Sequence, residues 1–85
     1  MFPKKIFKEY DTVKIKTLKE NIRKFDGTAS VKRSPQIGDK GIIVYVLGLT
    51  DGEVKYVVEA VNADGETIWV ADFWESELEK GRCLR

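Results

Sequence analysis

The stretch from residue 40 to residue 71 constrains the fold most, because it reads as three strands separated by tight turns. The run Ile42-Ile43-Val44-Tyr45-Val46-Leu47 is too rich in β-branched and aromatic residues for a helix of that length. Two glycines in residues 48–52 and one at Gly65 can supply the positive φ of hairpin turns. The sequence therefore predicts a three-stranded antiparallel meander over residues 42–47, 55–61 and 66–71.

Weaker patterns flank this meander on both sides. Residues 11–16 alternate polar and apolar side chains, as a half-buried first strand does, whereas residues 1–10 fit either an edge strand or a helical turn and count as an extension. Residues 73–79 fit one helical turn that leads into a short closing strand. We expect residues 80–85 to form a frayed tail.

In residues 17–37 the apolar side chains do not recur at the regular spacing of a strand or a helix. The segment 19–25 could form a short helix, but Gly27, Ser30, Ser34 and Pro35 interrupt any regular pattern. A loop of this length is uncommon in a small domain and is often functional. We therefore expect the loop to be the main binding element.

Size and composition indicate one folded domain over residues 1–85, with 42% hydrophobic and 34% charged residues. No apolar run reaches the roughly 20 residues of a membrane span, and the start of the chain lacks the apolar stretch of a secretion signal. We expect a cytoplasmic protein without membrane contact. Cys83 is the single cysteine, which we interpret as an incidental thiol.

The order of these segments resembles a known family. The residues that carry the resemblance are Asp11-Thr12-Val13-Lys14-Ile15-Lys16, Gly38-Asp39-Lys40-Gly41-Ile42-Ile43-Val44, the stretch Tyr56 to Thr67, and Glu77-Leu78-Glu79. Over residues 11–79 the chain is similar to small bacterial SH3-like barrel proteins of uncharacterised function. It is more distantly similar to the SH3-like domain of nitrile hydratase β subunits.

The resemblance implies an all-β fold: a small, strongly bent, five-stranded antiparallel barrel with a long loop after the first strand and a one-turn helix near the C-terminus. It also implies a binding or scaffold module, of a kind commonly encoded on mobile bacterial elements. It brings no catalytic residues, and the loop 17–37 is longer than is usual in the family.

Catalytic chemistry has little support in the sequence. The chain contains no histidine, which removes the commonest general base and every nucleophile scheme that depends on one. The acids Asp72, Glu75, Glu77 and Glu79 do not have the spacing of a calcium loop, and no phosphate-binding loop follows Gly41. We expect no enzyme activity, no cofactor and no metal site.

Aromatic residues are the best candidates for a contact surface, since tyrosine and tryptophan often anchor interfaces when exposed. Alternation leaves open whether Trp69 is exposed or whether its strand is covered on both sides. Our first hypothesis is a module that binds a protein or self-associates as a homo-oligomer through the loop and an aromatic patch. The candidate residues are Phe25, Tyr45, Tyr56, Trp69, Phe73 and Trp74.

Charge supports a second hypothesis. Residues 1–40 contain eleven Lys or Arg and five Asp or Glu, whereas residues 41–85 contain four and nine. Either the two halves pair their charges within the fold, or a basic loop binds nucleic acid. The nucleic-acid candidates are Lys16, Lys19, Arg23, Lys24, Lys32 and Arg33. A weaker third hypothesis, an enzyme accessory subunit, rests only on the nitrile hydratase likeness.

Overall fold

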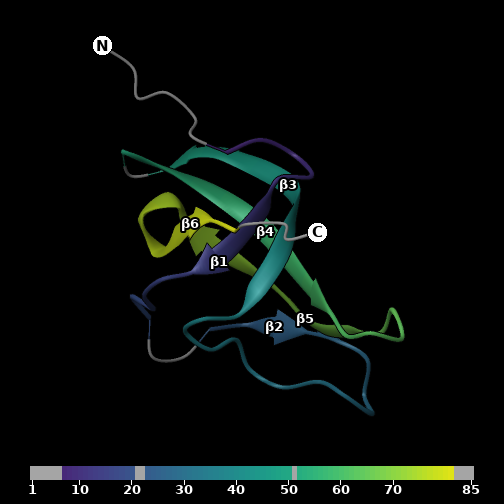
Figure 1. Cartoon of the computed structure of the whole chain (residues 1–85). Coiled ribbons are helices and arrows are strands. Elements are labelled where there is room, and N and C mark those ends of the chain that lie inside the picture. The colour runs from purple at the N-terminus through teal and green to yellow at the C-terminus, as the bar shows by residue number, and fades with distance from the viewer. Residues whose placement is uncertain (1–6, 21–22, 51, 82–85) are drawn as a thin grey trace.

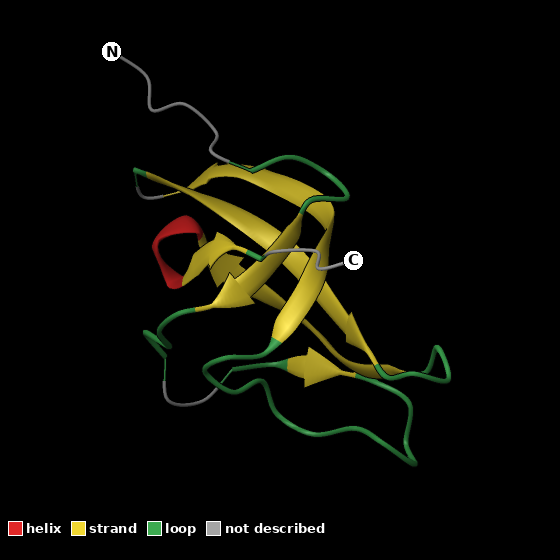
Figure 2. Cartoon of the chain, viewed as in Figure 1, coloured by secondary structure: helices red, strands yellow, loops and turns green. Residues whose placement is uncertain are grey.

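The computed structural model describes residues 7–20, 23–50 and 52–81, and in this part of the chain the fold is all-β (Figures 1 and 2). The elements in chain order are β1 (Thr12–Ile15), β2 (Phe25–Asp26), β3 (Lys40–Thr50), β4 (Glu53–Val61), β5 (Thr67–Trp74), the 3-10 turn η1 (Glu75–Glu77) and β6 (Leu78–Lys80). The expected first strand, meander, helical turn and closing strand are confirmed. The strands of the meander are longer than the sequence predicts.

All six strands belong to one antiparallel sheet in the order β2-β5-β4-β3-β1-β6. The prediction of a closed five-stranded barrel is wrong, because the sheet has six strands and ends in β2 and β6 without closing. Two short pairings account for the difference. Phe25 and Asp26 pair with Ala71 and Val70 and make β2 an extra edge strand, while β6 pairs with β1 at the other edge.

The segments around the meander differ from some of the expectations. No helix forms in the described part of residues 19–25, because Phe25 joins the sheet instead. Residues 7–10 form a turn rather than an edge strand, and Phe7 is buried there. The rest of the N-terminal extension, residues 1–6, lies outside the described residues, as do Cys83 and most of the expected tail.

β3 is bent where extra residues interrupt its pairing with β4. The register shifts between Ile43 and Tyr45 and again between Val46 and Gly48. An extra residue on one strand bends that strand and increases its local twist. Figure 1 shows β3 turning sharply along its length, so the sheet curls around one side.

The core fills the inner side of this curl. Trp69, Tyr56 and Phe73 are fully buried there, and the Phe73 ring lies 5.3 Å from that of Trp69. Phe7 packs edge-on against Tyr56 with ring centroids 5.6 Å apart, so the segment before β1 contributes to the core. Residues 54, 56, 58 and 60 of β4 are all buried, which shows the period of two that a half-buried strand requires. The described residues include no helix that is long and apolar enough to cross a membrane.

Gly41 of β3 lies close against β4. A Cβ atom at this position would be 2.7 Å from Cγ1 of Val58 and 2.8 Å from the main-chain oxygen of Glu59. The backbone oxygen cannot retreat without disturbing the pairing of the two strands. We therefore expect Gly41→Ala to lower the free energy of unfolding by about 1–3 kcal/mol, the usual cost of overpacking. An unchanged urea midpoint would contradict the close approach of the strands.

Candidate functional site

The structure divides the six aromatic candidates between the core and the surface. Tyr56, Trp69 and Phe73 have exposed fractions of 0%, so they cannot form part of a contact surface. Phe25 is half-buried and packs against the core. Trp74 is also half-buried, and Tyr45, with an exposed fraction of 54%, is the most accessible of the six.

Trp69 is fixed by a polar partner as well as by packing. Its indole Nε1 donates to Oδ2 of Asp39 at 2.9 Å. The same carboxylate accepts from both terminal nitrogens of Arg33, at 2.8 and 3.1 Å, and from the backbone amide of Gln36 at 3.0 Å. Asp39 therefore ties the end of the long loop to the largest residue of the core.

A buried ion pair fixes the other end of the loop. Nη2 of Arg23 lies 2.6 and 2.7 Å from the two carboxylate oxygens of Glu77, whose exposed fraction is 0%. Glu77 also accepts from the backbone amides of Lys19 and Trp74, at 2.7 and 2.8 Å. The Arg23 guanidinium lies 4.3 Å from the centre of the Phe73 ring. The long segment is thereby joined to η1 and to the core.

These contacts divide the six basic candidates for nucleic-acid binding into residues that form ion pairs within the fold and residues that do not. Arg23 is buried against Glu77, Arg33 is paired with Asp39, and Lys19 lies 3.2 Å from Glu53. Lys16, Lys24 and Lys32 are exposed, with no ion pair to any described residue. Part of the charge asymmetry of the sequence is thus used within the fold, because Lys14, Lys19 and Arg23 of the first half pair with acids of the second half.

The acidic residues near the C-terminus have separate partners. Glu77 binds Arg23, Glu75 accepts from the Tyr56 hydroxyl at 2.6 Å, and Glu79 lies 3.8 Å from Lys14. No group of three or more metal-ligating side chains is placed to hold an ion within the part of the chain that the structure describes.

A surface with exposed aliphatic side chains, not covered by any of the described segments, lies on the side of the sheet opposite the core, and we call it the outer face. Residues that pair directly across antiparallel strands share one side of the sheet. Ile42 of β3 and Val70 of β5 both pair with Glu59 of β4. The outer face consists of Thr12, Lys14, Lys40, Ile42, Val44, Tyr45, Lys55, Val57, Glu59, Val61, Thr67, Val70, Asp72, Trp74 and Asp26.

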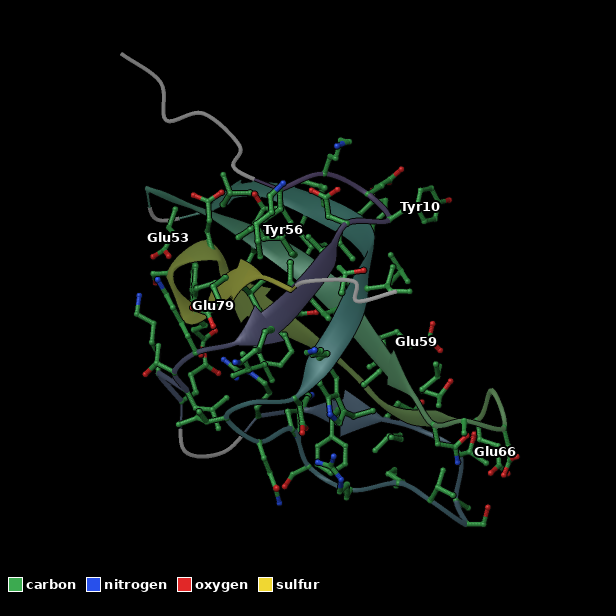
Figure 3. All side chains as sticks on the ribbon, in the orientation of Figure 1. Tyr10, Glu53, Tyr56, Glu59, Glu66 and Glu79 are labelled. Atoms are coloured by element: carbon green, nitrogen blue, oxygen red, sulfur yellow. The ribbon has the colours of Figure 1, made fainter. Side chains whose placement is uncertain are left out.

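Adjoining hollows run across this face. One, of about 340 Å³, is lined mainly by aliphatic groups of Ile42, Val44 and Val61. A second shares Val44 and Glu59 with it and extends to Val70, and a third continues from Val70 to Val57. Ile42 and Val61 have exposed fractions of 43% and 48%. Figure 3 shows Glu59 on β4, away from Tyr56 in the core.

The contact-surface candidates named from the sequence are aromatic, and they do not include the aliphatic residues of the outer face. A signal for them is present in the sequence, because Lys55 and Glu59 mark one side of the strand on which Val57 and Val61 also lie. Trp74 extends the face at its far end, where Nζ of Lys55 lies 4.6 Å from the centre of its ring.

Comparison of the chain with protein-family models, curated proteins and solved structures gives no match in any of the three.

The Asp39 contacts predict a pH dependence of stability. Burial raises the pKa of Asp39, but hydrogen bonds from Arg33, Trp69 and the Gln36 amide outweigh it and leave the pKa below its ordinary value of 3.8. A carboxylate with a lowered folded pKa contributes stability above its unfolded pKa, and this contribution is lost as pH falls through the folded pKa. We expect Asp39→Asn to be less stable than the native chain at neutral pH, with a flatter loss of stability below about pH 4.

Urea unfolding at a series of pH values measures this difference. Asp72→Asn is the matched control, because Asp72 is exposed on the outer face, and it should change the free energy of unfolding by no more than about 0.5 kcal/mol. Parallel pH profiles for the native chain and Asp39→Asn would show that the loop end is not held by this carboxylate.

Proposed function

We propose that this chain is a non-catalytic module that binds a protein through the outer face of its sheet. The observation that carries the proposal is the set of exposed aliphatic side chains around Ile42, Val44 and Val61, continued by Tyr45. Large contiguous apolar patches are uncommon on monomeric proteins and typically mark sites of interaction.

The anatomy of the outer face supports a protein as the bound molecule. An aliphatic centre is bordered by charged residues on both sides, with Lys40 towards β1 and Asp72 towards β5. A mostly apolar centre with a polar rim is the usual composition of protein interfaces. Tyr45 offers a large ring with a polar end, the type of residue that concentrates binding energy.

The long loop is a weaker candidate for the contact element than the sequence suggests. Its two ends are held by Arg23 and Asp39, and Pro35 is buried within it. Nucleic-acid binding is likewise a weaker proposal, because three of its six candidate cations are committed to ion pairs. Kinship with the small bacterial SH3-like proteins is also a proposal, supported by the bent sheet and by the 3-10 turn before the last strand.

Photo-crosslinking tests the outer face directly. A benzophenone amino acid replaces Tyr45 in one variant and Lys32, in the exposed part of the loop, in a control variant. After irradiation of native host cells, we expect position 45 to give adducts of higher mass that contain a second polypeptide. Position 32 should give few, since it lies outside the outer face.

The two positions also discriminate between surfaces. Adducts at position 32 but not at position 45 would assign recognition to the loop and overturn the proposal. Retention of both variants in the soluble fraction with native unfolding midpoints confirms that the substitutions leave the fold intact.

A further inference from the structure

The short strand β2 ends in an aspartate that is followed directly by a glycine, Asp26 and Gly27. The amide nitrogen of Gly27 donates to Oδ1 of Asp26 at 2.8 Å, so the side-chain carboxyl group lies beside the amide of the next residue. Within the described residues no backbone carbonyl accepts from this amide. Asp26 is exposed, so water reaches the pair.

An amide nitrogen beside the carboxyl group of the preceding aspartate is placed for a known covalent reaction. The nitrogen bonds to Cγ and loses its proton, while the protonated carboxyl group loses its hydroxyl, and the two leave together as water. The product is a cyclic imide. Water then opens the ring at either carbonyl, and opening at the former main-chain carbonyl gives isoaspartate, in which the main chain runs through the side-chain carbons. Neither an oxidant nor a reductant is needed.

A second Asp-Gly pair in the described part of the chain has a different geometry. Asp64 and Gly65 lie in the turn between β4 and β5, where the Gly65 amide donates to the Asn62 carbonyl at 3.0 Å. That amide is held by a backbone acceptor instead of the neighbouring carboxyl group. A third pair begins at Asp51, which lies outside the described residues. The two described sites thus share a dipeptide and differ in the contact that their fold imposes.

We infer that Asp26 is a site of spontaneous isomerisation to isoaspartate in the folded chain, and that the reaction detaches β2 from the sheet. Reacting groups already in contact need less reorganisation to meet. Gly27 has no side chain to shield its nitrogen. β2 also lies at the border of the sheet and pairs with β5 alone, as Figure 1 shows, and such a border opens locally at low cost. The reaction needs no partner, so it does not depend on the proposed function.

Close packing around Gly27 is the reason that isomerisation should detach the strand. A Cβ atom at Gly27 would lie 2.7 Å from the main-chain oxygen of Ile68, so the two backbones are already in contact. The next amide, of Thr28, donates to the Thr67 carbonyl at 2.8 Å. Isoaspartate inserts an extra carbon into the main chain between Asp26 and Gly27. Backbones this close have no room for it, so the hydrogen bond of Thr28 and the pairing of β2 should be lost.

Labelling with heavy-oxygen water tests the first part of the inference. The folded full chain is incubated in this water at mildly acidic pH, and each closure and opening of the ring leaves one solvent oxygen at the reacting residue. Trypsin separates the two sites, because the peptide of residues 25–32 contains Asp26 as its single acid and that of residues 56–80 contains Asp64. We expect Asp26 to gain label at least about fivefold faster than Asp64.

Two controls separate the effect of the fold from that of the dipeptide. In urea the contacts are absent, and the two sites should gain label at rates within about twofold of each other. Asp26→Glu would have to close a larger, slower ring, so it should gain little label at position 26 while keeping the native urea midpoint. Equal rates at Asp26 and Asp64 in the folded chain would overturn the inference, as would an Asp26→Glu variant that gains label as fast as the native chain.

Hydrogen exchange on the isoaspartyl form, separated from the native chain by reversed-phase chromatography and refolded, tests the second part. We expect the amide of Thr28 to lose its protection, whereas the amides of the β3–β4 hairpin keep theirs. Native protection at Thr28 in the isoaspartyl form would overturn the detachment of β2.

Discussion

The buried ion pair between Arg23 and Glu77 is the contact on which the remaining structure depends. Removing a carboxylate and a guanidinium from water is costly, and the cost is offset only when the remaining hydrogen-bonding positions are filled. Here two backbone amides donate to Glu77, and the ring of Phe73 lies under the guanidinium. The offset is incomplete, because Nη1 of Arg23 is buried without a hydrogen-bond partner among the described residues. The pair thereby fixes the path of the segment between β1 and β2 against the turn that follows β5.

The same segment is also attached to the edge of β5 and to the core. Thr28 donates its amide to the Thr67 carbonyl, and Arg33 donates its amide to the Ile68 carbonyl, so the loop continues the hydrogen bonding beyond the edge of β5. Asp39 completes the attachment through Trp69. Five basic residues of the described ranges, Lys8, Lys14, Lys19, Arg23 and Arg33, form ion pairs within the fold. The outer face is an exposed surface that remains for another molecule.

Local patterns in the sequence predict the strands well and their assembly poorly. Alternation places Trp69 and Ala71 on one face of their strand, and the structure buries both. Alternation does not show that this face is the core, because a residue that covers it, Arg23 over the ring of Phe73, comes from 50 positions earlier in the chain. β2 has only two residues, too few for any period to reveal, so the sixth strand and the open sheet could not be predicted.

The candidate site was also predicted only in part, because residue type can be read from the sequence but the side of the sheet on which a residue lies cannot. Tyr45 was identified from residue type and is exposed, but residue type alone could not separate it from Tyr56, which lies opposite the neighbouring Val46 and points into the core. The bulge at Val44 shifts the alternation between the two ends of β3, so the side on which each residue lies follows from the pairing with β4. The aliphatic groups of the outer face come from separate strands and gather only once the register is set.

The most direct test of this account is native-state hydrogen exchange on Arg23→Met, combined with urea unfolding. Loss of one partner leaves the charge of Glu77 buried and unpaired, so the free energy of unfolding should fall by about 3–5 kcal/mol. The amides of Thr28 and Arg33 should lose protection well before those of the β3–β4 hairpin, because the loop detaches first. Native protection at Thr28 and Arg33 with an unchanged midpoint would contradict the claim that the ion pair holds the loop to the sheet.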